Sequence, residues 1–317
     1  MKVLITGSSG YLGRILKSDL IKWKIPVTGI DTKECNEIIP GDHYNFYRCS
    51  ITDRENLREI FMKEQPTHVI HLACSFNKIR DMRKEYDVDI GGSVNVIEAA
   101  NSVASVKQLI YSSSASAYGG GKDNPDWLFE NSPLRPGKYR YGINKMMAEE
   151  SISDTTVRKD LRIVCLRICI VTGPSFRNNK SVVMILSRFP FLPDYCMKNK
   201  IQFLHEEDLS SVIKLILEDD QIEGVYNLAP DSYSLVSDLI PAKRIINIPL
   251  PVITSAIWIL WTLKIADIAP DSVSYCVNPV ILSPEKLIKR FAYEFKYSSN
   301  EAFRDAVNRS NLINRER

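Results

Sequence analysis

The stretch Thr6-Gly7-Ser8-Ser9-Gly10-Tyr11-Leu12-Gly13 decides the fold of this chain. It follows an apolar run at residues 2–5 that predicts a buried strand, and it opens a segment, residues 11–24, whose apolar spacing predicts a helix. Glycines three residues apart permit a tight turn, close approach of the backbone to a ligand, and close packing of helix on strand. The N-terminus of the helix offers free N–H groups and a partial positive charge, which bind phosphates. The loop predicts a dinucleotide site, with a plain glycine turn as the alternative.

Outward from this loop, strand-like and helix-like segments alternate. Further strands are expected at residues 26–30, 45–49, 68–72, 108–112 and 162–168, and helices at 54–63, 93–105 and 139–159. Apolar strands separated by helices of this length predict an α/β fold with a doubly wound parallel sheet.

The pattern changes near residue 170. Ten of the sixteen prolines lie at or beyond residue 174, which predicts a smaller lobe without a long sheet of its own. We therefore expect residues 1–169 to form the dinucleotide-binding domain. Residues 170–317 are expected to form mainly a substrate-binding α/β lobe, with about 201–230 returning to the first domain.

Composition excludes several classes of protein. The chain has 317 residues, 44% hydrophobic and 25% charged, which is typical of globular proteins. Its net charge of +3 is spread without a basic block, so we expect no nucleic-acid partner. Seven scattered cysteines without a Cys-x-x-Cys pair argue against a zinc site and a disulfide framework, and fit a reducing cytoplasm.

No membrane segment is expected. The apolar run at residues 2–5 is too short for a signal peptide. The longest apolar stretch, residues 248–263, has 16 residues and two prolines, whereas a bilayer span needs about 20. We predict a buried or groove-lining helix there, with contact to a membrane surface as the lesser alternative, and a core position for Trp258 and Trp261.

Asp31 ends the second predicted strand, 18 residues beyond Gly13. A carboxylate at this place can accept hydrogen bonds from the adenosine ribose hydroxyls and would repel a 2′-phosphate. The position predicts NAD rather than NADP, although Lys33 would partly offset the repulsion. A carboxylate that caps its own loop is the alternative.

Tyr141 and Lys145 are four residues apart and share one face of a predicted helix. A free Tyr hydroxyl has a pKa of about 10, and a nearby ammonium group would favour the phenolate. An ordinary solvated helix face is the alternative. The strand at 108–112 runs into serines 112, 113, 114 and 116, where a hydroxyl can bind a substrate oxygen, although chemistry alone does not rank the four.

These motifs come in the order found in the extended short-chain dehydrogenases/reductases. Further shared segments are His71-Leu72-Ala73, Leu166-Arg167, Gly173-Pro174 and the stretches 203–209 and 224–228. The chain most resembles the NAD-dependent epimerase/dehydratase branch that includes UDP-glucose 4-epimerase. The resemblance implies a Rossmann sheet, bound NAD, and hydride transfer at a secondary alcohol of a sugar.

The resemblance also implies roles for individual residues. It makes Ser114 the catalytic serine, Tyr141 the base, and Lys145 the residue that binds the ribose and lowers the pKa of Tyr141. Residues expected to contact the cofactor are Gly7, Ser9, Gly10, Tyr11, Leu12, Gly13, Asp31, Ile51, Asp53, Leu72, Ala73, Cys74 and Lys145. Asp89 stands where the family usually has Asn. Members usually form homodimers, here through helices within about 80–105 and 139–159.

Departures from the family pattern keep the substrate open. Ser114-Ala115-Ser116 replaces the Thr-Asp-Glu of many 4,6-dehydratases, which disfavours dehydration. Ile170 replaces an Asn, and the Arg that the family carries shortly before Phe203 is absent, so two anchors for a nucleotide diphosphate are missing, although Lys198 and Lys200 are near. The leading hypothesis is a nucleotide-sugar epimerase. The alternatives are a dehydrogenase/reductase of a less polar ketone or alcohol and a non-catalytic NAD-binding protein.

Overall fold

The computed structural model describes residues 1–33, 43–76, 81–176, 191–239, 244–263, 265 and 270–315. The chain forms two compact units. The first comprises Met1–Ser113, Asn144–Arg167 and Ser210–Tyr226, and the second comprises Ser114–Ile143, Ile168–Leu209 and Asn227–Arg317.

A seven-stranded sheet organises the first unit, in the order β11-β6-β5-β4-β1-β2-β3. Its strands are β1 (Val3–Thr6), β2 (Val27–Asp31), β3 (Tyr44–Arg48), β4 (His68–His71), β5 (Gln108–Ser114), β6 (Arg162–Ile168) and β11 (Gly224–Leu228). β1 pairs in parallel with both β2 and β4, so the strand order reverses there. Such a switch point is where doubly wound sheets bind ligands.

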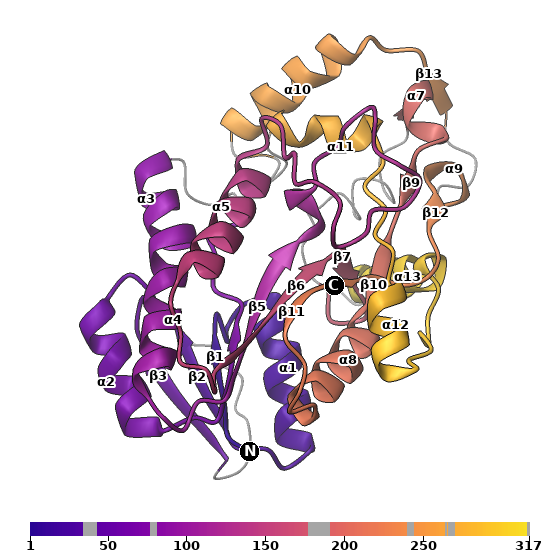
Figure 1. Ribbon diagram of the computed structural model, residues 1–317. Helices are drawn as coiled ribbons and strands as arrows, with labels where there is room; N and C mark the ends of the chain where they lie inside the picture. The colour runs from indigo at the N-terminus through magenta and orange to yellow at the C-terminus, as the bar shows by residue number, and fades with distance from the viewer. Residues whose placement is uncertain are drawn as a thin grey trace. The chain divides into compact units, whose positions relative to one another are not determined.

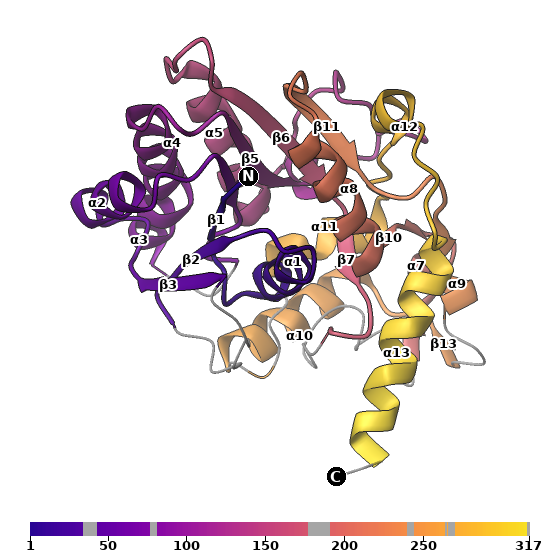
Figure 2. The same cartoon turned by 90° about the horizontal axis from the view of Figure 1, so that it is seen from below.

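Helices cover both faces of this sheet (Figures 1 and 2). On one face, α2 (Arg54–Glu64) and α4 (Gly92–Ser102) pack over a core of aliphatic side chains that includes Leu57, Val69 and Val96. On the other face lies α1 (Tyr11–Lys22), whose Asp19 accepts a hydrogen bond from Ser210 at 2.7 Å. The elements α3 (Met82–Tyr86), η1 (Asp87–Gly91), α5 (Arg140–Asp154) and α8 (Glu206–Glu218) complete the set. The predicted doubly wound fold is confirmed.

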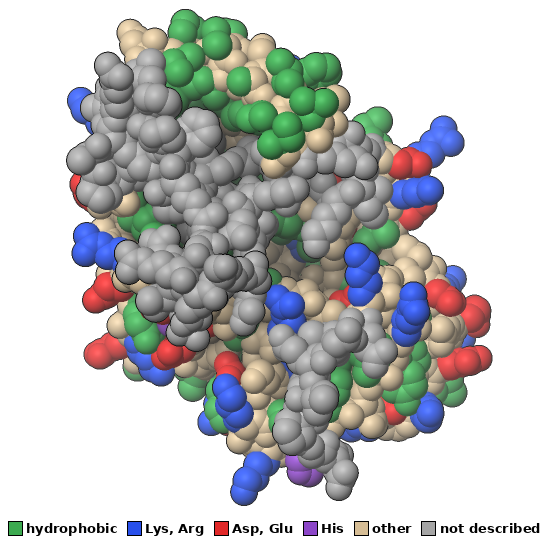
Figure 3. Space-filling model, turned by 180° about the vertical axis from the view of Figure 1, so that it is seen from behind, with side chains coloured by type: hydrophobic (Ala, Val, Ile, Leu, Met, Phe, Trp, Pro, Cys, Tyr) green, Lys and Arg blue, Asp and Glu red, His purple; other side chains and the backbone are tan. Residues whose placement is uncertain are grey.

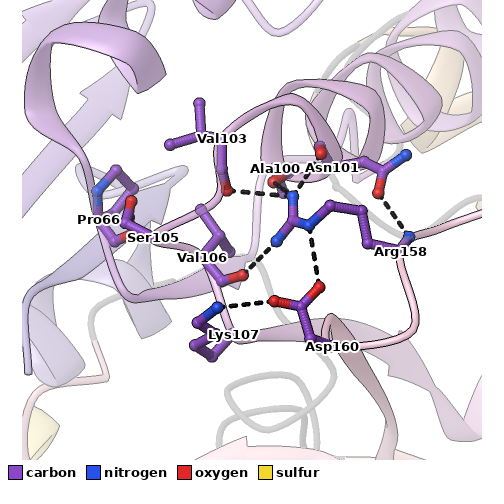
Figure 4. A network of polar contacts seen from close by, with 9 residues as sticks. All are labelled: Pro66, Ala100, Asn101, Val103, Ser105, Val106, Lys107, Arg158 and Asp160. Carbon is purple, nitrogen blue, oxygen red and sulfur yellow. Dashed lines mark hydrogen bonds and ion pairs between the residues drawn. The ribbon is translucent and has the colours of Figure 1, made fainter.

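Arg158 closes the C-terminal end of α4 (Figure 4). Its guanidinium donates to four carbonyl oxygens, two in the last turn of α4 and two just beyond it, and to Asp160 at 3.1 Å. The carbonyls belong to Ala100, Asn101, Val103 and Val106. Because the last carbonyls of a helix lack the full set of intrahelical bonds, the cation stabilises the end of α4 and the turn that leads into β5.

The second unit has only two-stranded sheets among its described residues: β10-β7, β12-β9 and β13-β8. Their strands are β7 (Ile170–Thr172), β8 (Phe191–Pro193), β9 (Lys200–Ile201), β10 (Phe203–His205), β12 (Ser234–Leu235) and β13 (Arg244–Ile246). Its helices are η2 (Ala115–Ala117), α7 (Asp194–Met197), α9 (Val236–Leu239), α10 (Leu250–Thr262), η3 (Pro270–Val273), α11 (Ser274–Val277), α12 (Glu285–Phe291) and α13 (Ser299–Arg315). Phe203 and Phe303 pack at the centre of its core, with ring centroids 5.2 Å apart.

The apolar helix α10 corrects one expectation. Residues 248–263 were predicted to be buried or to line a groove, yet no residue of α10 is buried. Trp258, predicted to be core, is 57% exposed, and Figure 3 shows apolar side chains gathered where α10 lies. Hydropathy alone could not reveal this exposure, because the helix has no charged residue to mark a solvated face. Within the described ranges, no helix combines the length and hydropathy of a membrane span.

Candidate active site

The loop between β1 and α1 is held by its own backbone. Gly7 and Ser8 donate from their amides to the carbonyl oxygen of Ile30, at 2.8 and 3.3 Å, and Gly10 donates to Gly7 at 3.0 Å. Gly7 has a φ of +75°, which favours glycine. A Cβ at Gly13 would lie 2.2 Å from the carbonyl oxygen of Gly7, so α1 starts directly against the turn. The helix that begins with Tyr11 and Leu12 has no side-chain cap at Gly10, which leaves its N-terminus open to a ligand.

The loop after β4 lies against the same turn. A Cβ at Gly7 would come within 2.8 Å of the Ala73 amide nitrogen, and Leu72 donates from its amide to Thr6 at 3.1 Å. Leu72, Ala73 and Cys74 are half-buried. The structure thus brings these three predicted cofactor residues beside the glycine loop, at the switch point of the sheet.

Asp31 joins the glycine loop to the end of β2. Its Oδ2 accepts a hydrogen bond from the Ser9 amide at 3.0 Å, and its Oδ1 accepts one from the Lys33 amide at 3.1 Å. Each carboxylate oxygen can accept a further bond. The carboxylate therefore both shapes its loop and can accept bonds from ribose hydroxyls.

Asp53 and Ile51 have clear structural contacts. The Asp53 carboxylate caps α2 by accepting from the Asn56 amide at 3.3 Å. Ile51 is buried, and its side chain would lie 2.6 Å from a Cβ at Gly92, which explains a glycine at the start of α4. A cofactor contact by either residue stays a prediction.

Helix α5 presents Tyr141, Lys145 and Glu149 on one face, because they recur every fourth residue. Lys145 is 4% exposed, donates to the Ser112 carbonyl oxygen at 2.6 Å, and lies 4.9 Å from the ring centroid of Tyr111. This anchors its ammonium group at the carboxyl end of β5. Tyr141 is 9% exposed, which excludes the solvated helix face considered as an alternative.

Ser114 is the last residue of β5. It is buried, and its Oγ accepts from the Ser116 amide at 3.1 Å, so it caps the short helix η2. Because the oxygen accepts this bond, the hydroxyl hydrogen is left to donate elsewhere. The neighbouring Ser113 instead donates to Glu149. That contact distinguishes two serines that the sequence did not rank.

A chain of polar contacts, which the sequence analysis missed, runs behind the glycine loop. Ser93 donates to the Asp89 carbonyl oxygen at 2.6 Å, so His71 must donate to Ser93 from Nε2 at 2.9 Å and accept from Thr6 at Nδ1. Burial, and then the charge of Lys145, lowers the pKa of His71 to about 3. His71 is therefore neutral and has a structural role behind the glycine loop.

Asp89 is buried, and its carboxylate accepts three hydrogen bonds. The Ser75 amide donates at 2.6 Å, the Ser75 hydroxyl at 2.7 Å, and the Asn144 side chain at 3.0 Å. Asp89 thus joins the loop after β4 to the residue that precedes Lys145. Only its position opposite the family's Asn could have drawn attention to it.

The second unit holds the positions where family anchors are missing. Ile170 is 36% exposed at the start of β7. Lys200 donates to Asp126 at 2.7 Å, and this contact raises the pKa of Lys200. Lys198 is exposed.

The sequence pattern that defines the NAD-dependent epimerase/dehydratase family matches residues 3–229. The chain belongs to this family. The predicted fold and the predicted NAD cofactor agree with this family, which is NAD-dependent.

Curated relatives agree with this assignment. The chain is 29% identical over 276 residues to a dTDP-D-glucose 4,6-dehydratase of Dictyostelium discoideum, covering 78% of this chain and 62% of that one. It is 31% identical over 179 residues to a UDP-glucose 4-epimerase of Lactobacillus helveticus, covering 55% and 53%. The match thus spans between half and two thirds of these relatives.

Solved structures share the fold at low identity. The Bordetella bronchiseptica enzyme WbmG in complex with NAD and UDP superposes with a TM-score of 0.77 at 22% identity, covering 98% of this chain and 94% of that one. The UDP-glucose 4-epimerase of Thermotoga maritima with UDP-glucose gives 0.77 at 21% identity, covering 99% of each.

Proposed function

We propose that this chain is an NAD-dependent nucleotide-sugar epimerase. The observation that carries the proposal is the anchoring of Lys145 on the Ser112 carbonyl oxygen, one helical turn after Tyr141. An ammonium group that is fixed one helical turn away from a tyrosine favours the phenolate form of that tyrosine. Among the relatives, an epimerase is the more similar in identity and a dehydratase the longer match.

The residues of the glycine loop fit a bound NAD. The Oγ atoms of Ser8 and Ser9 are buried and have no hydrogen-bond partner among the described residues. The Ser9 hydroxyl, beside an uncapped helix N-terminus, suits a diphosphate, whereas Ser8 Oγ lies against Gly29 of β2. We assign Gly7, Ser9, Gly10, Tyr11, Leu12 and Gly13 to the diphosphate side, and Asp31, Ile51, Asp53, Leu72, Ala73, Cys74 and Lys145 to the rest of the cofactor.

The chain's own residues supply the acid–base chemistry. Tyr141, as phenolate, takes the proton of the substrate hydroxyl that is oxidised and returns it when the carbonyl is reduced. Ser114 donates a hydrogen bond to the same oxygen, and Lys145 keeps the phenolate favoured. NAD, when bound, supplies the acceptor and donor of hydride. Epimerisation results when the ketone rotates and is then reduced on its opposite face.

One observation favours a second candidate. Ile170 is 36% exposed where the family carries an Asn, and a dehydrogenase/reductase of a less polar ketone or alcohol would use such an apolar group. The domain division at residue 169, the cytoplasmic location and a homodimer through about 80–105 and 139–159 remain part of the proposal. Residue 80 itself lies outside the described ranges.

Calorimetric titration of UDP, dTDP, GDP and CDP into the NAD-loaded protein tests the epimerase. Micromolar binding of one diphosphate is expected, and it selects the sugar series to assay. No binding of any diphosphate at millimolar concentration would overturn the epimerase and leave the second candidate. Light scattering at several concentrations tests the homodimer.

A further inference from the structure

One segment of the second unit bonds both to Ser116 and to the first residue of α5. It consists of η3 and α11, residues Pro270–Val273 and Ser274–Val277. The Tyr275 hydroxyl donates to the Ser116 carbonyl oxygen at 2.5 Å. The Asp271 carboxylate accepts from the Arg140 amide, at the first residue of α5, at 3.1 Å.

The backbone of Ser116 has close contacts at both its carbonyl oxygen and its amide. Its carbonyl oxygen would lie 2.4 Å from a Cβ at Gly142, so α5 passes directly against it, next to Tyr141. Its amide donates to Ser114 Oγ at 3.1 Å. Through its two flanking peptide groups, Ser116 therefore joins Ser114, which its amide contacts, to the Tyr275 hydroxyl, which its carbonyl oxygen contacts.

Aromatic contacts connect Tyr275 to the same turn of α5. The Tyr275 ring meets Tyr139 edge-on, with centroids 5.2 Å apart, and Tyr139 lies 5.9 Å from Tyr141. Burial raises the pKa of Tyr275 well above its ordinary range, and the charges of Tyr139 and Asp271 add to this effect. Its hydroxyl therefore stays protonated, and stays a donor, near neutral pH.

We propose that Tyr275 is a positioning residue that fixes Ser114 relative to the turn of α5 that carries Tyr141. The inference rests on the proposed function, since the roles of Ser114 and Tyr141 belong to that reaction. Without the Tyr275 hydroxyl, the peptide group that follows Ser116 can rotate, the backbone of Ser116 is held less firmly, and the bond from its amide to Ser114 weakens. Misplacement of a reacting group by about 1 Å can cost a hundredfold in rate.

The test compares Tyr275→Phe with Tyr293→Phe. Both variants remove one tyrosine hydroxyl bond in the second unit, since Tyr293 donates to Asp208 at 2.7 Å. With UDP-galactose as substrate, Tyr275→Phe is expected to lower kcat about tenfold while KM changes less than about twofold. Both variants are expected to lower the melting temperature by similar amounts, because each loses one hydrogen bond. Tyr293→Phe is expected to leave kcat unchanged. An unchanged kcat in Tyr275→Phe, beside an active wild type, would overturn the proposal.

A second measurement works without turnover. Hydrogen–deuterium exchange of the peptide that spans Ser114 to Tyr118 reports on the Ser116 amide. Tyr275→Phe should exchange faster here than the wild type and Tyr293→Phe, and equal exchange in all three proteins would overturn the positioning role. A wild type without turnover would count against the proposed function alone, because the exchange experiment still decides the role of Tyr275.

Discussion

Arg167 holds the carboxylate of Glu149 in a buried ion pair. Its Nη2 lies 2.7 Å from Oε2, and its Nε lies 3.1 Å from both carboxylate oxygens. The two side chains are 7% and 9% exposed. Glu149 also accepts from Ser113, so the pair joins β6, the end of β5 and the helix that carries Tyr141 and Lys145.

Breaking this pair should destabilise the fold strongly. Arg167→Met leaves the Glu149 charge buried and unpaired, which typically costs about 3–5 kcal/mol of unfolding free energy. Urea denaturation measures the loss. Lys107→Met is the control, because Lys107 pairs with Asp160 at 2.7 Å but both side chains are about half exposed, so little change is expected. Equal losses of unfolding free energy in the two variants would contradict the stabilising role of the pair formed by Glu149 and Arg167.

Gly7→Ala should reduce both stability and NAD affinity. Gly7 and Gly137 have positive φ angles, +75° and +63°, but a Cβ at Gly7 would meet Ala73 whereas nothing lies within 4 Å of one at Gly137. Gly137→Ala therefore carries only backbone strain, about 1 kcal/mol. Gly7→Ala must also separate the two loops of the proposed cofactor site. Fluorescence titration with NAD should show weaker binding only for Gly7→Ala, and equal affinities would argue against the loop as the diphosphate site.

His71 should make the protein less stable as the pH falls from 7 to 5. Its pKa is about 3 when folded and 6.5 when unfolded, so in this window the unfolded chain binds a proton that the folded protein does not. Linkage then predicts a loss of about 2 kcal/mol at pH 5 from this group. His68, whose pKa burial lowers to about 4, acts in the same direction. Chemical denaturation of wild type and His71→Gln at both pH values checks the effect, and an equal pH dependence of the two would refute it.

The sequence predicted the sheet and the glycine loop well because their signals are local. Strand ends such as Asp31 and the strand at residues 162–168 follow from apolar runs and punctuating polar residues. The Tyr141–Lys145 pair follows from its spacing together with the family resemblance. These features need no knowledge of what packs against them.

Contacts between distant segments were beyond the sequence. Tyr275 lies 159 residues from Ser116, and no pattern in either segment indicates their hydrogen bond. Glu149 shares the face of Lys145, which could have suggested a role, but its partner Arg167 sits on β6. The prediction that α10 is buried was wrong for a related reason. Its sequence is apolar, as predicted, but burial depends on which other parts of the chain pack over a helix.

Tyr141→Phe gives the most direct test of the proposed chemistry. The ring is 9% exposed, so Phe fits the same space and only the hydroxyl is lost. Loss of a general acid–base group costs about 10²- to 10⁴-fold in rate, so turnover should fall by that factor. Binding of NAD should be unchanged, because the diphosphate and ribose contacts are assigned to other residues. Steady-state assays and NAD titration of the variant, beside Tyr293→Phe, separate the two quantities. Turnover within a factor of two of wild type would exclude Tyr141 as the base, whereas a parallel loss of NAD binding would place it in the cofactor site instead.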